Sequence, residues 1–160
     1  MDEAAGMGRA VLQARLSPEE YLAFERASED RHEYADGEIF AMSGGTIAHS
    51  EITGNIYGEL RNAVRPRGCR VLNGDMRIHI EATGRYVYAD ALILCDKPLF
   101  HDGRMDTLLN PKLVVEVLSD STEAYDRGDK FAGYRTIPSL RTYVLASQKD
   151  LGSALLFFGL

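Results

Sequence analysis

Two strongly apolar runs, each interrupted by a single acid, constrain the fold more than any other feature of this sequence. They read YVYADALIL around Asp90 and KLVVEVL around Glu116. Runs of this length and composition predict strands that are buried on both faces of a sheet. An ionised carboxylate inside such a strand is costly unless its charge is compensated. Both acids therefore require a chemical explanation.

The alternation of side chains along a strand predicts where these acids point. Asp90 is expected in the interior of its strand, on the face of Leu92, and Glu116 on the face of Val114. If the two strands are neighbours, the acids meet across the ladder, where two carboxylates either share a proton or bind a divalent metal. The helix-like run TEAYDRGDKFAGY then brings Lys130 to the same place. Two acids and a lysine around Mg²⁺ predict phosphodiester hydrolysis, because the metal activates water and neutralises charge on phosphate oxygens.

Four motifs carry a resemblance to a known family. They are YADALIL, NPKLVVEVLSDST, YDRGDKFAGYRTIPSLRTYVL and, upstream, HEYADGEIFAMSGGTIAHS. On these residues the chain resembles the PD-(D/E)xK nuclease superfamily and, more narrowly, the Uma-two family of restriction-endonuclease-like proteins. The resemblance implies an α/β fold with a restriction-endonuclease-like core, in which a central mixed sheet is flanked by helices. It also implies that Asp90 and Glu116 are ligands of Mg²⁺ or Mn²⁺.

The chain departs from the family pattern in three places. The lysine usually stands two residues after the second acid, where this chain has Leu118, and the resemblance implies that Lys130 replaces it. The proline that precedes the first acid is Ala89 here, and the serine-proline step reads Ser119-Asp120. None of these changes removes a metal ligand. A plain helical salt bridge from Asp126 is the alternative role for Lys130, since the two are four residues apart.

Two upstream residues are further site candidates through the resemblance. Glu38 follows the Asp36-Gly37 turn of a predicted hairpin, and His49 stands at the start of a helix expected over residues 47–64. A solvated carboxylate and an ordinary polar residue at a helix start are the respective alternatives.

The charge distribution bears on nucleic-acid binding. A formal charge of -6 argues against a protein that coats nucleic acid by charge alone. Residues 61–85 nevertheless contain six arginines and two acids. We expect Arg61, Arg65 and Arg77 to contact phosphates, because guanidinium groups bind phosphate oxygens in pairs. A solvated surface is the alternative.

Length and cysteine usage bound the organisation. The 160 residues fit one domain, with a flexible leader over 1–16, the nuclease-like domain over 17–147 and an atypical C-terminal tail over 148–160. Cys69 and Cys95 have no CxxC spacing, so we expect reduced core residues in a cytoplasmic protein. No run approaches the ~18 apolar residues that a membrane helix requires.

Some local structure is left open by the sequence. A helix is expected from Ser17, because the serine is followed by a proline and by glutamates. The segment CRVLNGDMRIHIE is either a hairpin at Asn73-Gly74 or one bent strand.

The function expected from these observations is metal-dependent endonucleolytic cleavage of DNA. One site cuts one strand, so cleavage of duplex DNA favours a homodimer. The alternative is the same fold without cutting activity, kept as a module that binds nucleic acid or a protein. The net acidity and the unusual C-terminal run favour this alternative, and the intact set of two acids and a lysine opposes it.

Overall fold

The computed structural model describes residues 15–42 and 44–149 and the backbone of 158–159. Residues 1–14 of the expected leader and most of the expected tail lie outside these residues. The elements in chain order are α1 (Pro18–Ala27), β1 (His32–Ala35), β2 (Glu38–Ala41), α2 (Ile47–Val64), the 3-10 helix η1 (Arg65–Arg67), β3 (Arg70–Asn73), β4 (Arg77–Ile80), β5 (Arg85–Tyr88), β6 (Ala91–Leu94), the 3-10 helix η2 (His101–Gly103), β7 (Thr107–Leu108), β8 (Leu113–Val117), α3 (Glu123–Arg127), α4 (Asp129–Tyr134), β9 (Thr142–Ala146) and β10 (Phe158–Gly159).

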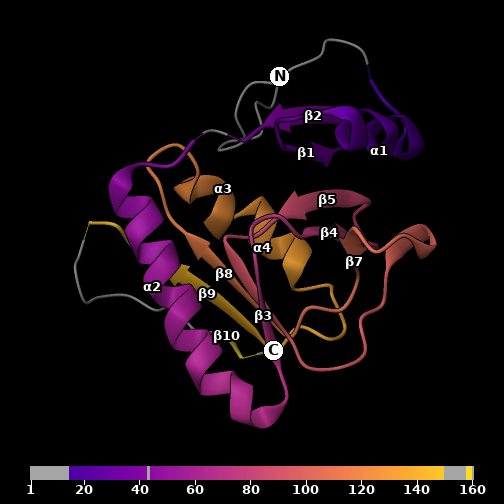
Figure 1. The fold of residues 1–160 in the computed structure, drawn as a ribbon. Helices are drawn as coiled ribbons and strands as arrows, with labels where there is room; N and C mark the ends of the chain where they lie inside the picture. Colours follow the sequence, from indigo (N-terminus) through magenta and orange to yellow (C-terminus); the bar gives the residue numbers. More distant parts are fainter. Residues whose placement is uncertain (1–14, 43, 150–157, 160) are drawn as a thin grey trace.

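The strands form two five-stranded sheets (Figure 1). The first has the order β2-β1-β5-β4-β7 and the second the order β10-β9-β8-β6-β3. Both are mixed, because β4 runs parallel to β7 and β8 runs parallel to β9 while the other neighbours are antiparallel. The predicted α/β architecture of mixed sheet flanked by helices is confirmed, with two mixed sheets in place of the single central sheet that was expected.

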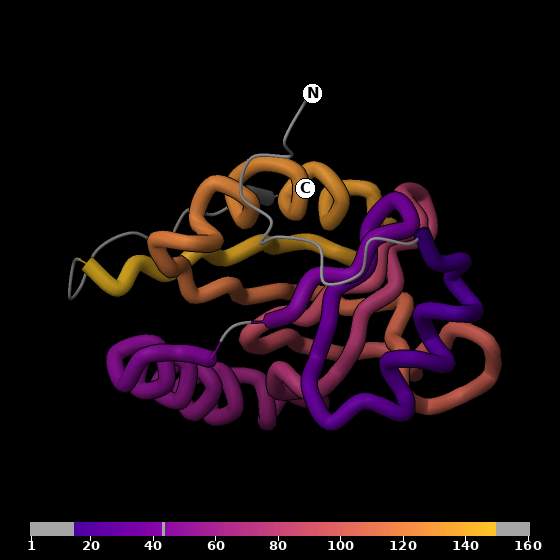
Figure 2. Tube along the Cα trace, turned by 90° about the horizontal axis from the view of Figure 1, so that it is seen from above, coloured from indigo at the N-terminus to yellow at the C-terminus, as the bar shows by residue number. Residues whose placement is uncertain are grey.

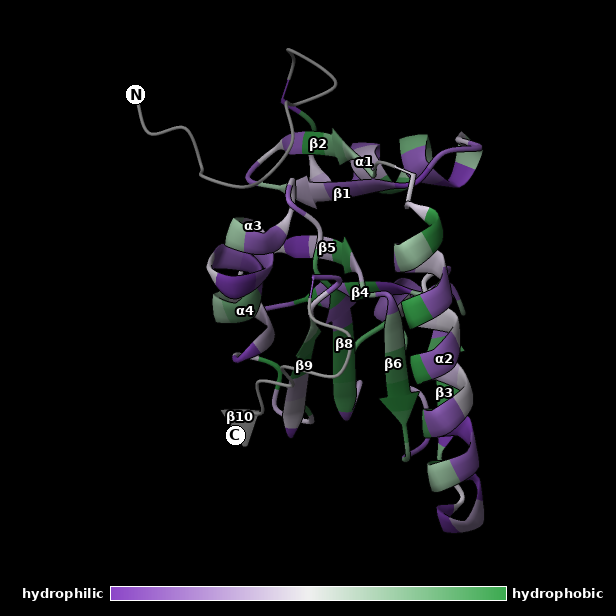
Figure 3. Cartoon of the chain, turned by 90° about the vertical axis from the view of Figure 1, so that its left-hand side faces the viewer, coloured by the Kyte–Doolittle hydropathy of each residue, from purple (hydrophilic) through white to green (hydrophobic). Residues whose placement is uncertain are grey.

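Helices cover the two faces of the second sheet. Figure 2 shows α2 on one side of β8 and β9, and α3 and α4 on the other side. Side chains alternate between these faces along β8, since Val114 belongs to the core under α4 and Val115 to the core under α2. The hydropathy colouring in Figure 3 marks β6 and β8 as strongly apolar. This burial on both faces explains the two apolar runs of the sequence.

The expectation that Asp90 lies inside one continuous strand is wrong. The run divides into β5 and β6, which belong to different sheets, and Asp90 lies in the step between them. The preceding segment makes the same change, because β3 lies in the second sheet and β4 in the first. The sequence leaves open whether residues 69–81 form a hairpin or one bent strand. The structure shows two strands, β3 and β4, that belong to different sheets. At the crossing, a Cβ on Gly74 would lie 3.2 Å from the Ala89 carbonyl oxygen, so the two steps pack closely.

Local signals near the N-terminus predict the structure correctly. Ser17 caps α1 in a capping box with Glu20. The turn of the β1–β2 hairpin has positive φ at Asp36 (52°) and Gly37 (86°), as a two-residue hairpin loop of this twist requires. The helix expected over residues 47–64 is α2.

The cysteines correct a second expectation. Cys69 and Cys95 are joined by a disulfide and are not reduced. The pairing of β3 with β6 places Arg70 opposite Leu94, so the next position of the ladder brings the two cysteines opposite each other. Sequence spacing carries no information on this register. Within the described residues, no helix has the length and apolar character needed to cross a membrane.

Candidate active site

Asp90 and Glu116 lie side by side on the seam between the two sheets. Strand β6 pairs with β8 so that Ala91 faces Val115, and Asp90 precedes this ladder beside the same stretch of β8 as Glu116. The backbone fixes Asp90 firmly. Its N–H donates to the Val115 carbonyl oxygen over 3.0 Å, and its Oδ2 accepts a 2.6 Å hydrogen bond from the Val117 N–H.

Lys130 reaches this place from α4. Its ammonium group is 2.9 Å from Glu116 Oε1 and 2.7 Å from Glu33 Oε1, and it donates to the Tyr88 carbonyl oxygen over 2.8 Å. Two of the three N–H donors of this ammonium group form hydrogen bonds, to Glu33 and to Tyr88, and Glu116 is its ion-pair partner. The residue is only 3% exposed. The structure therefore brings Lys130 to Glu116 in a buried position.

Glu33 is the member of this cluster that sequence reasoning missed. Its Oε1 also accepts from the Tyr88 N–H, over 3.0 Å, and its Oε2 accepts from the Tyr125 hydroxyl, over 3.0 Å. The missed signal is an acid inside the four-residue strand β1, whose residues are all buried. The two longer runs are apolar around their acids, whereas β1 has a histidine beside Glu33, so its sequence does not mark this acid as buried.

Glu38, the glutamate that the resemblance marked, lies elsewhere. It stands at the start of β2, opposite Ala35, and is partly exposed. Among the described residues, no ion pair or side-chain hydrogen bond joins it to the cluster.

His49 contacts the cluster from the solvent side. The N-cap residue Thr46 accepts the His49 N–H, which sets the first turn of α2. His49 Nε2 lies 3.4 Å from Asp90 Oδ1, and the two side chains are 23% and 20% exposed. The bond to Asp90 raises the pKa of His49. This pair is the most accessible part of the site, whereas Glu116 and Lys130 lie behind it.

The cluster holds more acids than bases. Burial raises the pKa of Glu116 well above its usual range and that of Asp126 to about 6. Burial alone would lower the pKa of Lys130, but Glu116 and Glu33 raise it well above its usual range. No ion pair joins Asp126 to Lys130 in the part of the chain that the structure describes. Glu116 thus interacts electrostatically with one buried lysine and with three other carboxylates, those of Glu33, Asp90 and Asp126.

This excess of negative charge fits a divalent cation. Mg²⁺ is usually held by one or two carboxylates and keeps several waters. Asp90, in the step before β6, and Glu116 on β8 supply two such oxygen donors, and both contacts of Glu116 with Lys130 and Tyr134 are made by Oε1. Groups of three or more His, Cys, Asp or Glu suited to hold a metal are absent from the described residues. A site of two carboxylates completed by water is therefore the arrangement that fits.

The arginines divide into exposed and buried members. Arg61 and Arg65 are exposed near the end of α2, and neither forms an ion pair among the described residues. Arg77, by contrast, is 4% exposed. Its guanidinium donates to Thr107 Oγ1 and to the Tyr88 hydroxyl and lies 3.2 Å from Asp106 Oδ2. This burial removes Arg77 from the surface on which we expected it to meet phosphates.

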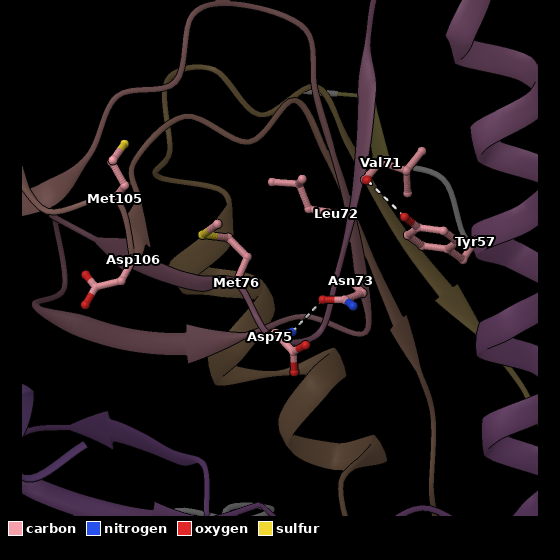
Figure 4. Close-up of a pocket in the computed structure, with 8 residues that line it drawn as sticks. All are labelled: Tyr57, Val71, Leu72, Asn73, Asp75, Met76, Met105 and Asp106. Atoms are coloured by element: carbon pink, nitrogen blue, oxygen red, sulfur yellow. Dashed lines mark hydrogen bonds between the residues drawn. The ribbon is translucent and has the colours of Figure 1, made fainter. Parts of the chain in front are cut away.

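A surface pocket of about 380 Å³ lies beside the backbone of the seam (Figure 4). Its lining residues are Tyr57, Val71, Leu72, Asn73, Asp75, Met76, Met105 and Asp106. Asn73 is opposite Ala91, next to Asp90 in the chain. Two acids and no base line the pocket, so its charge disfavours phosphate groups.

Comparison of folds defines the class of protein. A crystal structure from Anabaena variabilis ATCC 29413, described as "a putative nuclease belonging to DUF820", aligns with a TM-score of 0.69 and 14% sequence identity. The alignment covers 91% of this chain and 85% of that chain. The chain therefore has the α/β fold of that protein, which confirms the fold expected from the sequence.

Sequence comparison then gives the family. The model of the Uma2 family, described as "Putative restriction endonuclease", matches residues 18–152, and the chain belongs to this family. Two uncharacterized proteins of Synechocystis sp., slr1290 and sll1609, are similar to it. The first is 42% identical over 138 residues, which cover 86% of this chain and 71% of that protein. The second is 34% identical over 133 residues, which cover 83% of this chain and 75% of that protein.

Proposed function

We propose that the chain is a metal-dependent endonuclease that hydrolyses phosphodiester bonds in DNA, with Asp90 and Glu116 as ligands of Mg²⁺ or Mn²⁺. The observation that carries the proposal is the closeness of two carboxylates, Asp90 beside β8 and Glu116 within it, next to a buried lysine. Membership in the family described as "Putative restriction endonuclease" supports it.

Each residue of the cluster has a distinct role in this proposal. A bound divalent ion supplies an activated water and neutralises charge on the phosphate. The Val117 N–H orients Asp90, and Lys130 together with the Tyr134 hydroxyl holds Glu116 in place. His49 stands at the accessible side of Asp90, where it exchanges protons with solvent and substrate.

The proposed roles of the two glutamates in the β1–β2 hairpin rest on different evidence. Glu33 fixes Lys130 through a 2.7 Å ion pair, and this contact supports a role in positioning. Glu38 stays a prediction that rests on the family resemblance.

Plasmid cleavage tests the proposal. Supercoiled DNA is incubated with the purified protein and Mg²⁺ or Mn²⁺, and nicked and linear products are quantified. We expect cleavage that requires the metal, disappears in Asp90→Ala and is accompanied by metal binding in calorimetry. The melting temperature of the variant shows whether it is folded. Intact plasmid together with the absence of metal binding would refute the proposal.

The proposed substrate contacts and assembly follow from the same geometry. We infer that Arg61 and Arg65 bind the DNA backbone, since both are exposed and unpaired within the described residues. Duplex cleavage by a single site per chain favours a homodimer. Cytoplasmic location stays a prediction, and the Cys69–Cys95 disulfide weighs against it because such bonds are rare in reducing compartments.

A binding module without cutting activity is the second candidate. The formal charge of -6 and the burial of Lys130 among protein groups favour it. In that case neither the wild type nor Asp90→Ala cleaves DNA, and both bind it with the same affinity in a gel-shift assay.

A further inference from the structure

Two of the four histidines have no part in the candidate active site and lie against each other. His32 is bonded to the buried Glu25, and His49 contacts Asp90. His79 on β4 and His101 in η2 are 4.5 Å apart between ring centroids, with their planes inclined by 52°. Both rings are partly exposed.

Hydrogen bonds orient both rings. His79 Nδ1 is 3.1 Å from the Arg85 carbonyl oxygen. A carbonyl only accepts, so Nδ1 carries the proton and Nε2 keeps its lone pair. His101 Nε2 is 3.1 Å from the Tyr86 hydroxyl, which leaves Nδ1 outside this bond. Each ring therefore has one nitrogen held by an oxygen and one nitrogen uncommitted, as metal-binding histidines typically do.

Packing and charge also favour a cation between these rings. Tyr86 stacks on His79 at 4.1 Å between centroids and limits its rotation. Burial, with His101 nearby, lowers the pKa of His79, so this imidazole is neutral at neutral pH. Glu81 acts electrostatically on His79 in the direction that favours a positive charge at this ring.

We propose that His79 and His101 bind a divalent transition-metal ion of the Zn²⁺, Ni²⁺ or Cu²⁺ type. Imidazole nitrogen suits these ions, whereas Mg²⁺ prefers oxygen. His79 Nε2 and His101 Nδ1 are the ligands, and water completes the coordination because no larger cluster of ligating residues occurs in the described residues. When His101 Nδ1 binds the ion, its proton resides on Nε2 and is donated to the Tyr86 oxygen. The ion joins β4 to the η2 segment and is independent of the proposed nuclease site.

Calorimetric titration with Ni²⁺ alone tests this proposal. The untagged protein carries Asp90→Ala and His49→Ala, which disable the other candidate site, and no reductant is added, so that the cysteines stay paired. We expect one equivalent of Ni²⁺ to bind and to raise the melting temperature. His79→Phe in the same background keeps the aromatic packing on Tyr86 but lacks the ligand nitrogen, and it should weaken binding by roughly tenfold or more. His101→Ala should have the same effect.

The outcomes separate this site from the nuclease proposal. Absence of Ni²⁺ binding in the background protein overturns the inference, as does equal binding by His79→Phe when its melting temperature without metal matches that of the background. Neither result bears on plasmid cleavage, because the background lacks Asp90 and His49. A nuclease that fails to cut DNA likewise leaves the Ni²⁺ result intact.

Discussion

Replacement of Lys130 by methionine isolates the electrostatic core of the candidate site. Methionine has nearly the length of the lysine stem but no charge, so the packing against α4 is largely kept. The change leaves Glu33 and Glu116 buried without the cation that lies 2.7 and 2.9 Å away in the wild type. Removal of one partner from a buried ion pair costs about 3–5 kcal/mol. At about 2–4 °C per kcal/mol for a domain of this size, the melting temperature should fall by about 6–20 °C.

The loss of stability in Lys130→Met should increase as the pH rises. Burial raises the pKa of Glu116, so the folded state favours its protonated form. A carboxyl whose pKa is raised on folding destabilises the fold increasingly as the pH rises above its unfolded value. Without Lys130 this effect grows, since the charge that opposed it is gone. The variant should therefore lie much closer to the wild type at pH 5 than at pH 8.

Thermal denaturation at several pH values measures both effects. Lys97→Met is the matched control, because Lys97 is exposed and should shift the melting temperature by about 1 °C or less. Adding Glu33→Gln to Lys130→Met removes one of the orphaned charges and should restore part of the stability. Wild-type melting of Lys130→Met at pH 8 would show that the lysine does not hold the two acids in solution.

Three further predictions concern other parts of the chain. Reduction of the Cys69–Cys95 bond, which closes a loop of 26 residues, should lower the free energy of unfolding by about 3–4 kcal/mol, measured in urea with and without dithiothreitol. Burial raises the pKa of Asp126 to about 6. The stability that its protonated form contributes is therefore lost as the pH rises from the usual pKa of an aspartate to about 6, and Asp126→Asn should remove this slope from the pH–stability curve. Arg61→Gln with Arg65→Gln should reduce the salt dependence of DNA binding, with a log–log slope smaller by about 0.9 per lost phosphate contact. An unchanged slope in filter-binding titrations would exclude these arginines as backbone contacts.

Strongly local signals are the part of the fold that the sequence predicts. The capping box at Ser17, the Asp36-Gly37 turn and the apolar β8 strand act through neighbours in the chain. The strand break at Asp90 is not predicted, because the apolar pattern of the sequence continues without interruption where the chain passes from one sheet to the other. The register of strand pairing cannot be predicted from local sequence either. The two cysteines are an example, since only the pairing of β3 with β6 brings them together.

The membership of the site follows the same division. Asp90 and Glu116 can be identified from the sequence because each is the single acid in an apolar run. Glu33 stands in a strand of four residues beside a histidine, where a polar residue attracts no attention. Its role depends on contacts with Tyr88 and Lys130, which are 55 and 97 residues away. Long-range contacts of this kind have no local pattern in the sequence.

Tyr88 shows why the site lies at the seam between the sheets. It is the last residue of β5, and its N–H and carbonyl groups bond to Glu33 and Lys130. Its hydroxyl extends away from the cluster and donates to Glu25 in α1, beside Arg77. The end of the strand thus frees two backbone groups that fix Glu33 and the lysine, while the step that follows places Asp90 beside β8, next to Glu116. The break in the apolar run is therefore what assembles the cluster, and a continuous strand at this position would engage the same backbone groups in ladder hydrogen bonds.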